Sequence, residues 1–363
     1  MLNVIRKNDV LGLLQALLIF FIFWTAKKPL VFMIEESSRE IIYLLGAILF
    51  CLTLFCSFIL VRLNKIKASI FQLAIMLLLL PVALVYGNEF GVYKAFSIIF
   101  MLNMTVTTYL INPSSFNIRT ILLVMAGIFL FYGLLSSIWI YIVGYDFDER
   151  SVIVFNGPIV FGQYMIISCT IFLLYQSKIK ALVAFLLSFL SQSKGPLFGG
   201  LLAFLFSSKN KVRSMLILLT FLVGTVVFLE LDLRVFSWIF TLIDSGAISE
   251  VSSFSARIDA YQQSYRLVSQ SFMGLGLGGW SDVSYLRYPH NIFLEILVEL
   301  PLLLGICLIL LMLFAFHSIK DSSYRILFIA ILFMALFSGS IVDNRGVFFV
   351  TMLFLLHQGK LRV

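Results

Sequence analysis

Residues 118–143 read IRTILLVMAGIFLFYGLLSSIWIYIV and carry a single charged side chain, Arg119, close to their start. A helix of this length can cross the roughly 30 Å of hydrocarbon in a bilayer, because each residue adds about 1.5 Å. Similar apolar runs recur along the chain, which is 61% hydrophobic and only 12% charged. A soluble domain has about 25% charged residues. The composition therefore predicts an all-α polytopic membrane protein, since the runs are continuous and not alternating as in a membrane barrel.

We expect about twelve membrane spans in one integral membrane domain, with a large polar loop between the ninth and the tenth. This loop, at 230–290, separates residues 1–229 with nine spans from residues 291–363 with three. The run that follows Arg6 and Lys7 lacks a good cleavage site, so we expect a first span there and not a signal peptide. The expected spans are residues 10–26, 41–61, 68–86, 91–111, 118–143, 158–175, 179–192, 195–207, 212–229, 291–315, 325–342 and 346–357.

The distribution of charge predicts the orientation of these spans. Most Lys and Arg residues lie in the segments on one side, where Asp9 and Asp321 are the only acids. The positive-inside rule makes this side cytoplasmic, with both termini, and places the 230–290 loop outside. Lys94 and Arg345 belong to the cations of the short outer segments. The net charge of +8 then reflects topology and not nucleic-acid binding, and an outer loop without cysteines suits the periplasm, hence the bacterial inner membrane.

The large loop contains two expected helices and a glycine-rich segment. The pattern at 236–242 predicts an interfacial amphipathic helix, and a second helix is expected at about 256–270. Candidate N-cap residues of the second helix are Ser252, Ser253 and Ser255. The segment MGLGLGGW at 273–280 has too much glycine for a helix. Its glycines, Gly276 and Gly278 among them, let the backbone approach a ligand or another helix closely.

His290 stands where this loop meets the next span, in the stretch RYPHNIFLE at 287–295. An imidazole titrates near neutral pH and can act as a general base or acid. The alternative role is that of a polar residue that caps the helix at the membrane interface. Glu295 and Glu299 follow within the span, and buried carboxylates in hydrocarbon are costly. We expect both to pair with a cation or with a neighbouring helix end, on a face away from His290.

Three cations on the outer side are candidates for binding an anionic, phosphate-bearing ligand. Lys194 lies in the turn SQSKGP between two short spans, Arg257 begins the second loop helix, and Arg345 lies in the turn VDNRG. A fixed cation near a helix start favours a phosphate group. The alternative is that these side chains bind lipid headgroups. Arg266, nine residues after Arg257, falls on the opposite helix face and is expected to be solvated.

The order of these segments resembles the O-antigen ligase/polymerase superfamily, which comprises Wzy-type polymerases and WaaL-type ligases. The similar segments are SQSKG between two short spans, SFSARIDAYQQSYRLVSQSFMGLGLGGW in the outer loop, and PHNIFLEILVELPLLLG at the next span. The resemblance covers about 158–315. It implies that His290 is the family's essential histidine, with Asn291 its neighbour, Arg257 the loop arginine and Glu299 the glutamate of the family pattern.

The sequence departs from the family pattern at two places. Lys194 stands where arginine is usual, and Pro301 and Leu304 stand at the positions of a Gly-x-x-Gly motif. The second difference favours a polymerase over a ligase, because the polymerases are the more divergent group. The resemblance therefore implies a polymerase first and a ligase as the alternative.

The activity that the resemblance implies is glycosyl transfer at the periplasmic face, from a donor linked to undecaprenyl diphosphate. A polymerase lengthens O-antigen or a related surface polysaccharide, whereas a ligase transfers the glycan to lipid A-core. A lipid-glycan flippase or transporter is the alternative from another class. Expected partners are the lipid-linked donor and acceptor, membrane lipids, a chain-length regulator and a flippase; no cofactor and no metal is expected. The expected site consists of His290 as catalytic residue, Lys194, Arg257, Asn291 and Arg345 for the diphosphate and substrate, and Glu299, Gly276 and Gly278 as structural support.

Overall fold

The computed structural model describes residues 118–143, 158–207 except 192, and 252–357 except 338, together with Gly91, Lys94, Ala95, Ile98, Met101 and Leu102. Every regular element within these residues is a helix, and they contain no β-strand. The predicted all-α class is therefore confirmed for the described part of the chain. The spans expected at 10–26, 41–61, 68–86 and 212–229 and the helix expected at 236–242 lie outside it, and 91–111 is described only at the single residues named above.

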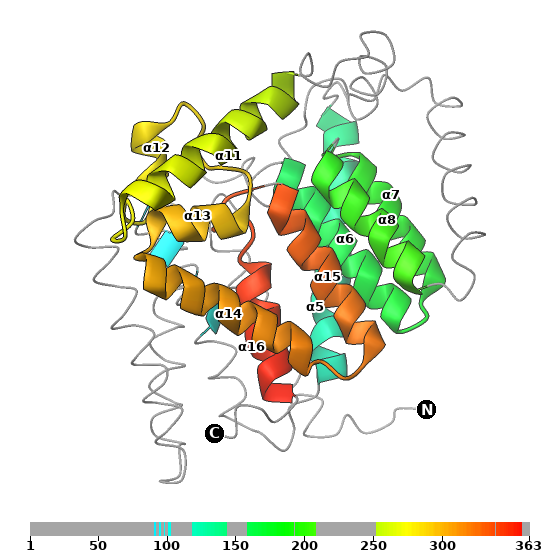
Figure 1. Cartoon of the computed structure of the whole chain (residues 1–363). Coiled ribbons are helices and arrows are strands. Elements are labelled where there is room, and N and C mark those ends of the chain that lie inside the picture. The colour runs from blue at the N-terminus through cyan, green and yellow to red at the C-terminus, as the bar shows by residue number, and fades with distance from the viewer. Residues whose placement is uncertain are drawn as a thin grey trace, which may run out of the picture.

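Four helices come from the first described ranges: α5 (Ile118–Val143), α6 (Pro158–Leu174), α7 (Lys178–Phe189) and α8 (Lys194–Ser207). Helix α6 packs against the other three (Figure 1). Gly162 of α6 faces the start of α8, where an added Cβ atom would lie only 2.5 Å from Ser191 Oγ and 2.9 Å from Pro196. The missing side chain therefore lets the start of α8 approach α6 closely.

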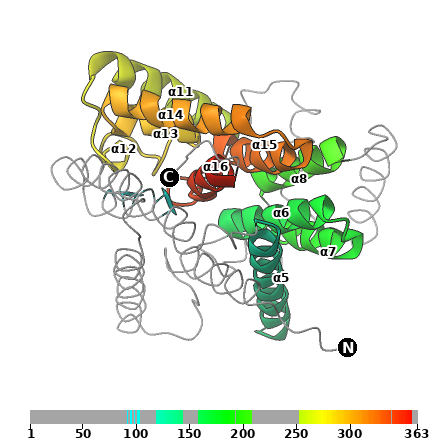
Figure 2. The same cartoon turned by 90° about the horizontal axis from the view of Figure 1, so that it is seen from below.

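The last three helices complete a bundle with α6 and α8. They are α14 (Leu302–Ser318), α15 (Ser322–Phe337) and α16 (Gly346–His357). Helix α15 packs against α6 and α8, and α16 lies in the middle, in contact with both α14 and α15 (Figure 2). Every residue of α16 up to Leu356 is buried. A helix that is apolar on all sides is expected in such a central position.

A second layer consists of α11 (Ser252–Gln270), α12 (Trp280–Val283) and α13 (Ile292–Glu299). Helix α11 lies across α13 at one end of the bundle (Figure 1). The buried side chains of Ala260, Trp280 and Val298 form a small core of their own between these three helices. The layer thus attaches to the bundle as a packed unit.

The helix expected at 256–270 is confirmed, but it begins earlier than expected. Helix α11 begins at Ser252. The residues Ser253 and Ser255 therefore lie inside the helix, and their predicted role as N-caps is wrong. Serine is tolerated in a first helical turn, so a run of serines leaves the start of a helix undetermined by sequence.

The single span expected at 291–315 is wrong, because the chain breaks between α13 and α14. Leu300 (φ −92°, ψ 155°) and Pro301 (φ −49°, ψ 131°) are extended. Proline has no N–H group for the helical ladder, and it disfavours a helical conformation in the residue before it. Loop residues bond the chain on either side of the break: the N–H of Leu275 donates to the carbonyl of Val298, and the N–H of Leu302 to that of Phe272, both at 2.8 Å.

Helices α5 and α16 have the bounds of expected spans, whereas α6, α7, α8 and α15 differ from the expected spans at their ends. Only the segment Ile118–Ile138 of α5 is, among the described residues, both long and apolar enough to cross a membrane. Shorter apolar helices of 10–17 residues are Ile159–Leu174, Gly195–Ser207, Leu302–Ser318, Ser322–Phe337 and Gly346–His357. The span expected at 325–342 ends early, at Phe337. Gly339, with φ of 82°, has the left-handed conformation that commonly ends helices.

Candidate functional site

His290 lies in the turn that leads into α13, immediately after the buried Pro289. Its φ of 58° is a left-handed backbone conformation, which is uncommon outside glycine although histidine is among the residues that adopt it. The ring of Tyr288 packs edge-on against the imidazole, with 4.6 Å between the ring centroids. The residue is partly exposed, although its Nδ1 atom is buried.

Asn291 is the N-cap residue of α13. Its Oδ1 atom accepts hydrogen bonds from the N–H groups of Phe293 at 2.9 Å and Leu294 at 3.2 Å. The same side chain also acts on the hydroxyl of Tyr261 on α11, whose pKa it lowers. Asparagine is one of the best N-cap residues, because its carbonyl satisfies N–H groups that have no partner within the helix. Asn291 therefore fixes the start of α13 and joins it to α11; its expected role in substrate binding stays a prediction.

Arg257 and Tyr261 lie one turn apart on α11, so their side chains are neighbours on the helix surface. Burial raises the pKa of the Tyr261 hydroxyl, while the charge of Arg257 and the side chain of Asn291 act in the opposite direction. The hydroxyl also donates to the carbonyl oxygen of Leu336, near the end of α15, at 3.5 Å. Arg257 is partly exposed, whereas Arg266 is exposed. The structure thus brings Arg257 into the neighbourhood of the turn that carries His290.

Lys194 is the first residue of α8, and not part of a turn between two helices as expected. Two contacts place this helix start: Pro196 lies against Gly162 of α6, and Gly199 lies against Met334 of α15. Lys194 is therefore at the same end of the bundle as the C-terminal end of α15, where Tyr261 bonds Leu336. The positive end of the helix dipole lies there, so this end of α8 favours an anion.

Arg345 is only 2% exposed, much more buried than an outer-turn cation would be. Its Nη1 atom donates to the carbonyl of Val342 and its Nη2 atom to the hydroxyl of Tyr164, both at 2.7 Å. The neighbouring Asn344 accepts a hydrogen bond of 2.8 Å from Gln163. These bonds attach the turn before α16 to the start of α6. The charge of Arg345 therefore sits inside the same end of the bundle, in a fixed position.

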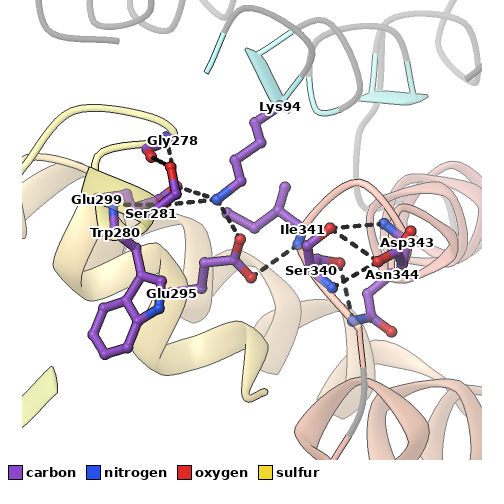
Figure 3. A network of polar contacts seen from close by, with 10 residues as sticks. All are labelled: Lys94, Gly278, Trp280, Ser281, Glu295, Glu299, Ser340, Ile341, Asp343 and Asn344. Atoms are coloured by element: carbon purple, nitrogen blue, oxygen red, sulfur yellow. Dashed lines mark hydrogen bonds and ion pairs between the residues drawn. The ribbon is translucent and has the colours of Figure 1, made fainter. Parts of the chain in front are cut away.

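Glu295 and Glu299 share a single cation, Lys94 (Figure 3). The Lys94 Nζ atom lies 2.5 Å from Glu295 Oε1 and 2.6 and 2.8 Å from the two oxygens of Glu299. All three side chains are completely buried. The prediction that the two glutamates pair with a cation is confirmed. Lys94, which was expected in a short outer segment, is buried inside the protein, where the two carboxylates stabilise its charge.

The two carboxylates also bind backbone N–H groups from other segments. Glu299 accepts from Gly278 at 3.0 Å and from Trp280 at 3.3 Å, and Glu295 accepts from Ile341 at 2.9 Å. We call Lys94, Glu295 and Glu299 with these three N–H groups the Lys94 network (Figure 3). It joins α13 to the glycine-rich segment and to the turn at 339–345.

The glycine-rich segment at 273–280 closely approaches the helical residues Gly91 and Lys94, as its glycines led us to expect. Gly276 and Gly278 have φ of 81° and 86°, which side-chain-bearing residues rarely adopt. A Cβ atom added to Gly91, one turn before Lys94, would lie 1.8 Å from the carbonyl oxygen of Leu277. Gly91 and Lys94 thus lie on one helix face, against the glycine-rich segment. The described contacts give Gly276 and Gly278 a place in the packing around α13.

The expected site residues form two groups, one at the start of α13 and one at its end. His290, Asn291 and Arg257 meet at its start, at the bundle end that also holds Lys194 and Arg345. Glu299, Gly276 and Gly278 meet at its end. Sequence reasoning missed Tyr261 and Lys94; a signal for each was present, in the four-residue spacing of Arg257 and Tyr261 and in the need of two buried acids for a cation. The described residues include no group of three or more His, Cys, Asp or Glu side chains that could hold a metal ion.

Comparison with known proteins adds no relative. No protein-family model matches the chain, and no curated protein matches it significantly. The resemblance described above therefore depends on the order and spacing of the quoted motifs.

Proposed function

We propose that the chain is an integral membrane glycosyltransferase that polymerises undecaprenyl-diphosphate-linked repeat units at the periplasmic face of the bacterial inner membrane. The observation that carries the proposal is the position of Tyr261, which lies one turn from Arg257, is influenced by Asn291 beside His290, and bonds Leu336 at the bundle end where Lys194 begins α8. A base and two cations in one place are what transfer from a lipid diphosphate requires.

Exposed apolar side chains support the membrane part of the proposal. On α5, Phe131 is 58% and Ile142 is 69% exposed, and on α14, Leu303 is 76% and Phe314 is 52% exposed. Contact of such side chains with water costs about 25 cal/mol per Å² of apolar surface, whereas contact with lipid chains does not. Twelve spans, with both termini in the cytoplasm, belong to the same proposal.

In the proposed reaction His290 removes the proton from an acceptor sugar hydroxyl. The acceptor oxygen forms a bond to the anomeric carbon of the donor glycan. The bond between that carbon and the diphosphate oxygen breaks, and undecaprenyl diphosphate leaves with the bonding electrons. Arg257 and Lys194 stabilise the negative charge that develops on the diphosphate. A fixed cation in this position does the work for which nucleotide-sugar transferases commonly use a divalent ion.

Arg345 has a different part in this proposal from the other two cations. Its guanidinium group is bonded to Val342 and Tyr164 inside the protein. A buried charge is screened less by water and salt than an exposed one. Arg345 therefore raises the positive potential at this end of the bundle, which attracts a diphosphate.

The test is polymerisation by purified protein with lipid-linked repeat units as the only glycan substrate. We expect His290→Ala to yield no product longer than one repeat, although the variant accumulates in the membrane as the unchanged protein does. The matched control is His317→Ala, since His317 is exposed in the last turn of α14. Chains of normal length from the His290→Ala protein would remove the histidine from the mechanism.

The same assay separates the alternative functions. Elongated glycan on undecaprenyl diphosphate indicates a polymerase. Product that forms only after lipid A-core is added indicates a ligase. Absence of both products, together with movement of lipid-linked glycan across vesicle membranes, indicates a flippase.

A further inference from the structure

The Lys94 network brings one ammonium group and three backbone N–H groups to two buried acids. Lys94 contacts three carboxylate oxygens, and the fourth, Glu295 Oε2, accepts from the N–H of Ile341. The N–H groups of Gly278 and Trp280 add one bond to each oxygen of Glu299. Every carboxylate oxygen thus has a donor within 3.3 Å. Such a buried network of ion pairs and hydrogen bonds is rigid, because any displacement leaves a charge without a partner.

One connection of this network leads to His290. The N–H of Glu295 donates to the carbonyl of Asn291 at 3.0 Å, so the carboxylate lies one helical turn from the residue that follows His290. Helix α13 has only eight residues. It is held at its centre through Glu295 and at its end through Glu299, which fixes the direction from which its start presents His290.

Two further connections lead to the cations. Trp280, whose backbone N–H binds Glu299, packs its side chain against Ala260 of α11, the residue next to Tyr261 and three after Arg257. Ile341, whose N–H binds Glu295, lies in the same short turn as Arg345. The network therefore touches each of the three segments that carry His290, Arg257 and Arg345.

We propose that Lys94 is a positioning residue of the proposed active site, which it serves by holding the glycine-rich segment and the turn at 339–345 against α13. This inference rests on the proposed function for its catalytic part. Without the lysine, the two buried carboxylates of α13 lose their shared cation, and single backbone N–H bonds alone hold the two segments against the helix. His290 and the arginines then lose their relative positions, and misplacement by about 1 Å can lower a catalytic rate about 100-fold.

The experiment compares Lys94→Met with Lys94→Arg and with the control Lys320→Met, since Lys320 is exposed in the turn between α14 and α15. Two quantities are measured: kcat and KM for lipid-linked repeat units, and amide hydrogen exchange of Gly278, Trp280 and Ile341 without substrate. For Lys94→Met we expect kcat to fall about 100-fold with KM changed less than about threefold, because the groups that bind substrate remain. The three amides should exchange at least about tenfold faster.

The conservative variant and the control decide between positioning and general damage. Lys94→Arg keeps the charge and should recover a large part of kcat and of the amide protection, whereas Lys320→Met should change neither. Unchanged amide exchange in Lys94→Met would overturn the proposal. A normal kcat in Lys94→Met together with faster amide exchange would also overturn the proposal.

A second variant covers the case in which Lys94→Met fails to fold. In Lys94→Met/Glu295→Gln/Glu299→Gln, neutral amides replace the charges, and their oxygens can still accept the backbone N–H groups. We expect this protein to accumulate, with faster exchange of the same three amides and a lower kcat; behaviour equal to that of the unchanged protein would overturn the proposal. Amide exchange can be measured without enzymatic activity. If the protein without substitutions is inactive in the assay but the amides still exchange faster in Lys94→Met, the proposed function is contradicted and the holding role of Lys94 is not.

Discussion

The start and the end of α13 carry polar groups in opposite environments, although eight residues separate them by only about 12 Å. At the start, His290 is partly exposed and the side chain of Asn291 caps the helix. At the end, Glu299 is completely buried and receives hydrogen bonds from Lys94, Gly278 and Trp280. The partly exposed residue proposed for catalysis, His290, and the buried supporting residue, Glu299, therefore lie at different ends of α13. Changes at the start should affect activity more than stability, and changes at the end the reverse.

The largest effect is expected at the buried end. Glu299→Ala leaves the N–H groups of Gly278 and Trp280 without an acceptor and removes one of the two partners of Lys94. Removing one partner from a buried ion pair typically costs about 3–5 kcal/mol. Thermal unfolding of the purified protein in detergent measures this loss. The control is Asp259→Ala, because Asp259 is exposed on α11; similar losses in the two variants would mean that Glu299 supports nothing.

The next effect concerns the cation beside the start of α13. Arg257→Ala should lower kcat/KM by about 30-fold, which corresponds to about 2 kcal/mol of transition-state stabilisation, while the melting temperature stays nearly constant. Arg266→Ala on the exposed face of the same helix is the matched control. Equal losses of activity in both variants would show that the two faces of α11 do not differ in function.

A smaller effect separates the backbone of His290 from its side chain. Its φ of 58° favours glycine, so His290→Gly should unfold with a free energy about 1 kcal/mol greater than that of His290→Ala. Both variants should lack polymerisation activity, because both lack the imidazole. Chemical denaturation of the two proteins in one detergent measures the difference. If the alanine variant is the more stable one, the left-handed turn before α13 does not persist without the histidine.

No effect is expected from removal of divalent metal ions. Arg257 and Lys194 supply fixed positive charge in the proposed site, so excess EDTA should leave the polymerisation rate unchanged. Loss of activity with the chelator and its return with magnesium or manganese would require metal ligands, for which Asp259 and Asp282 are the first residues to test.

The helices were the most predictable part of the fold. The runs at 118–143 and 346–357 coincide with the bounds of α5 and α16, because continuous apolar residues without a proline leave the chain few alternatives. The break at Pro301 was not predicted, although proline is a strong helix breaker. Apolar residues on both sides of it have the composition of a single span, and the loop that binds the two free ends is distant in sequence.

The candidate site could be predicted residue by residue but not as a set of contacts. His290 and Arg257 have unusual positions in the sequence, and a polar residue at the edge of an apolar run is visible without a structure. Lys94 was assigned to an outer segment because it lies near the start of such a run. Its partner Glu299 is 205 residues away in the sequence, and only the fold brings the two together. Tyr261 was passed over for a similar reason, since an aromatic residue in an amphipathic helix is usually a packing residue.

The break at Pro301 also changes which groups the backbone can bind. In an unbroken helix the N–H of Leu302 would donate to the carbonyl of Val298, four residues earlier. Here the same two groups bind Phe272 and Leu275 instead, so two hydrogen bonds between distant segments replace one within a helix. An alanine at position 301 would remove the barrier to the helical bond, and the two arrangements would then compete for the same pair of groups. Because Pro301 prevents the helical bond, the two groups bind residues 272–275. The proline therefore determines both where α13 ends and which segment it binds there.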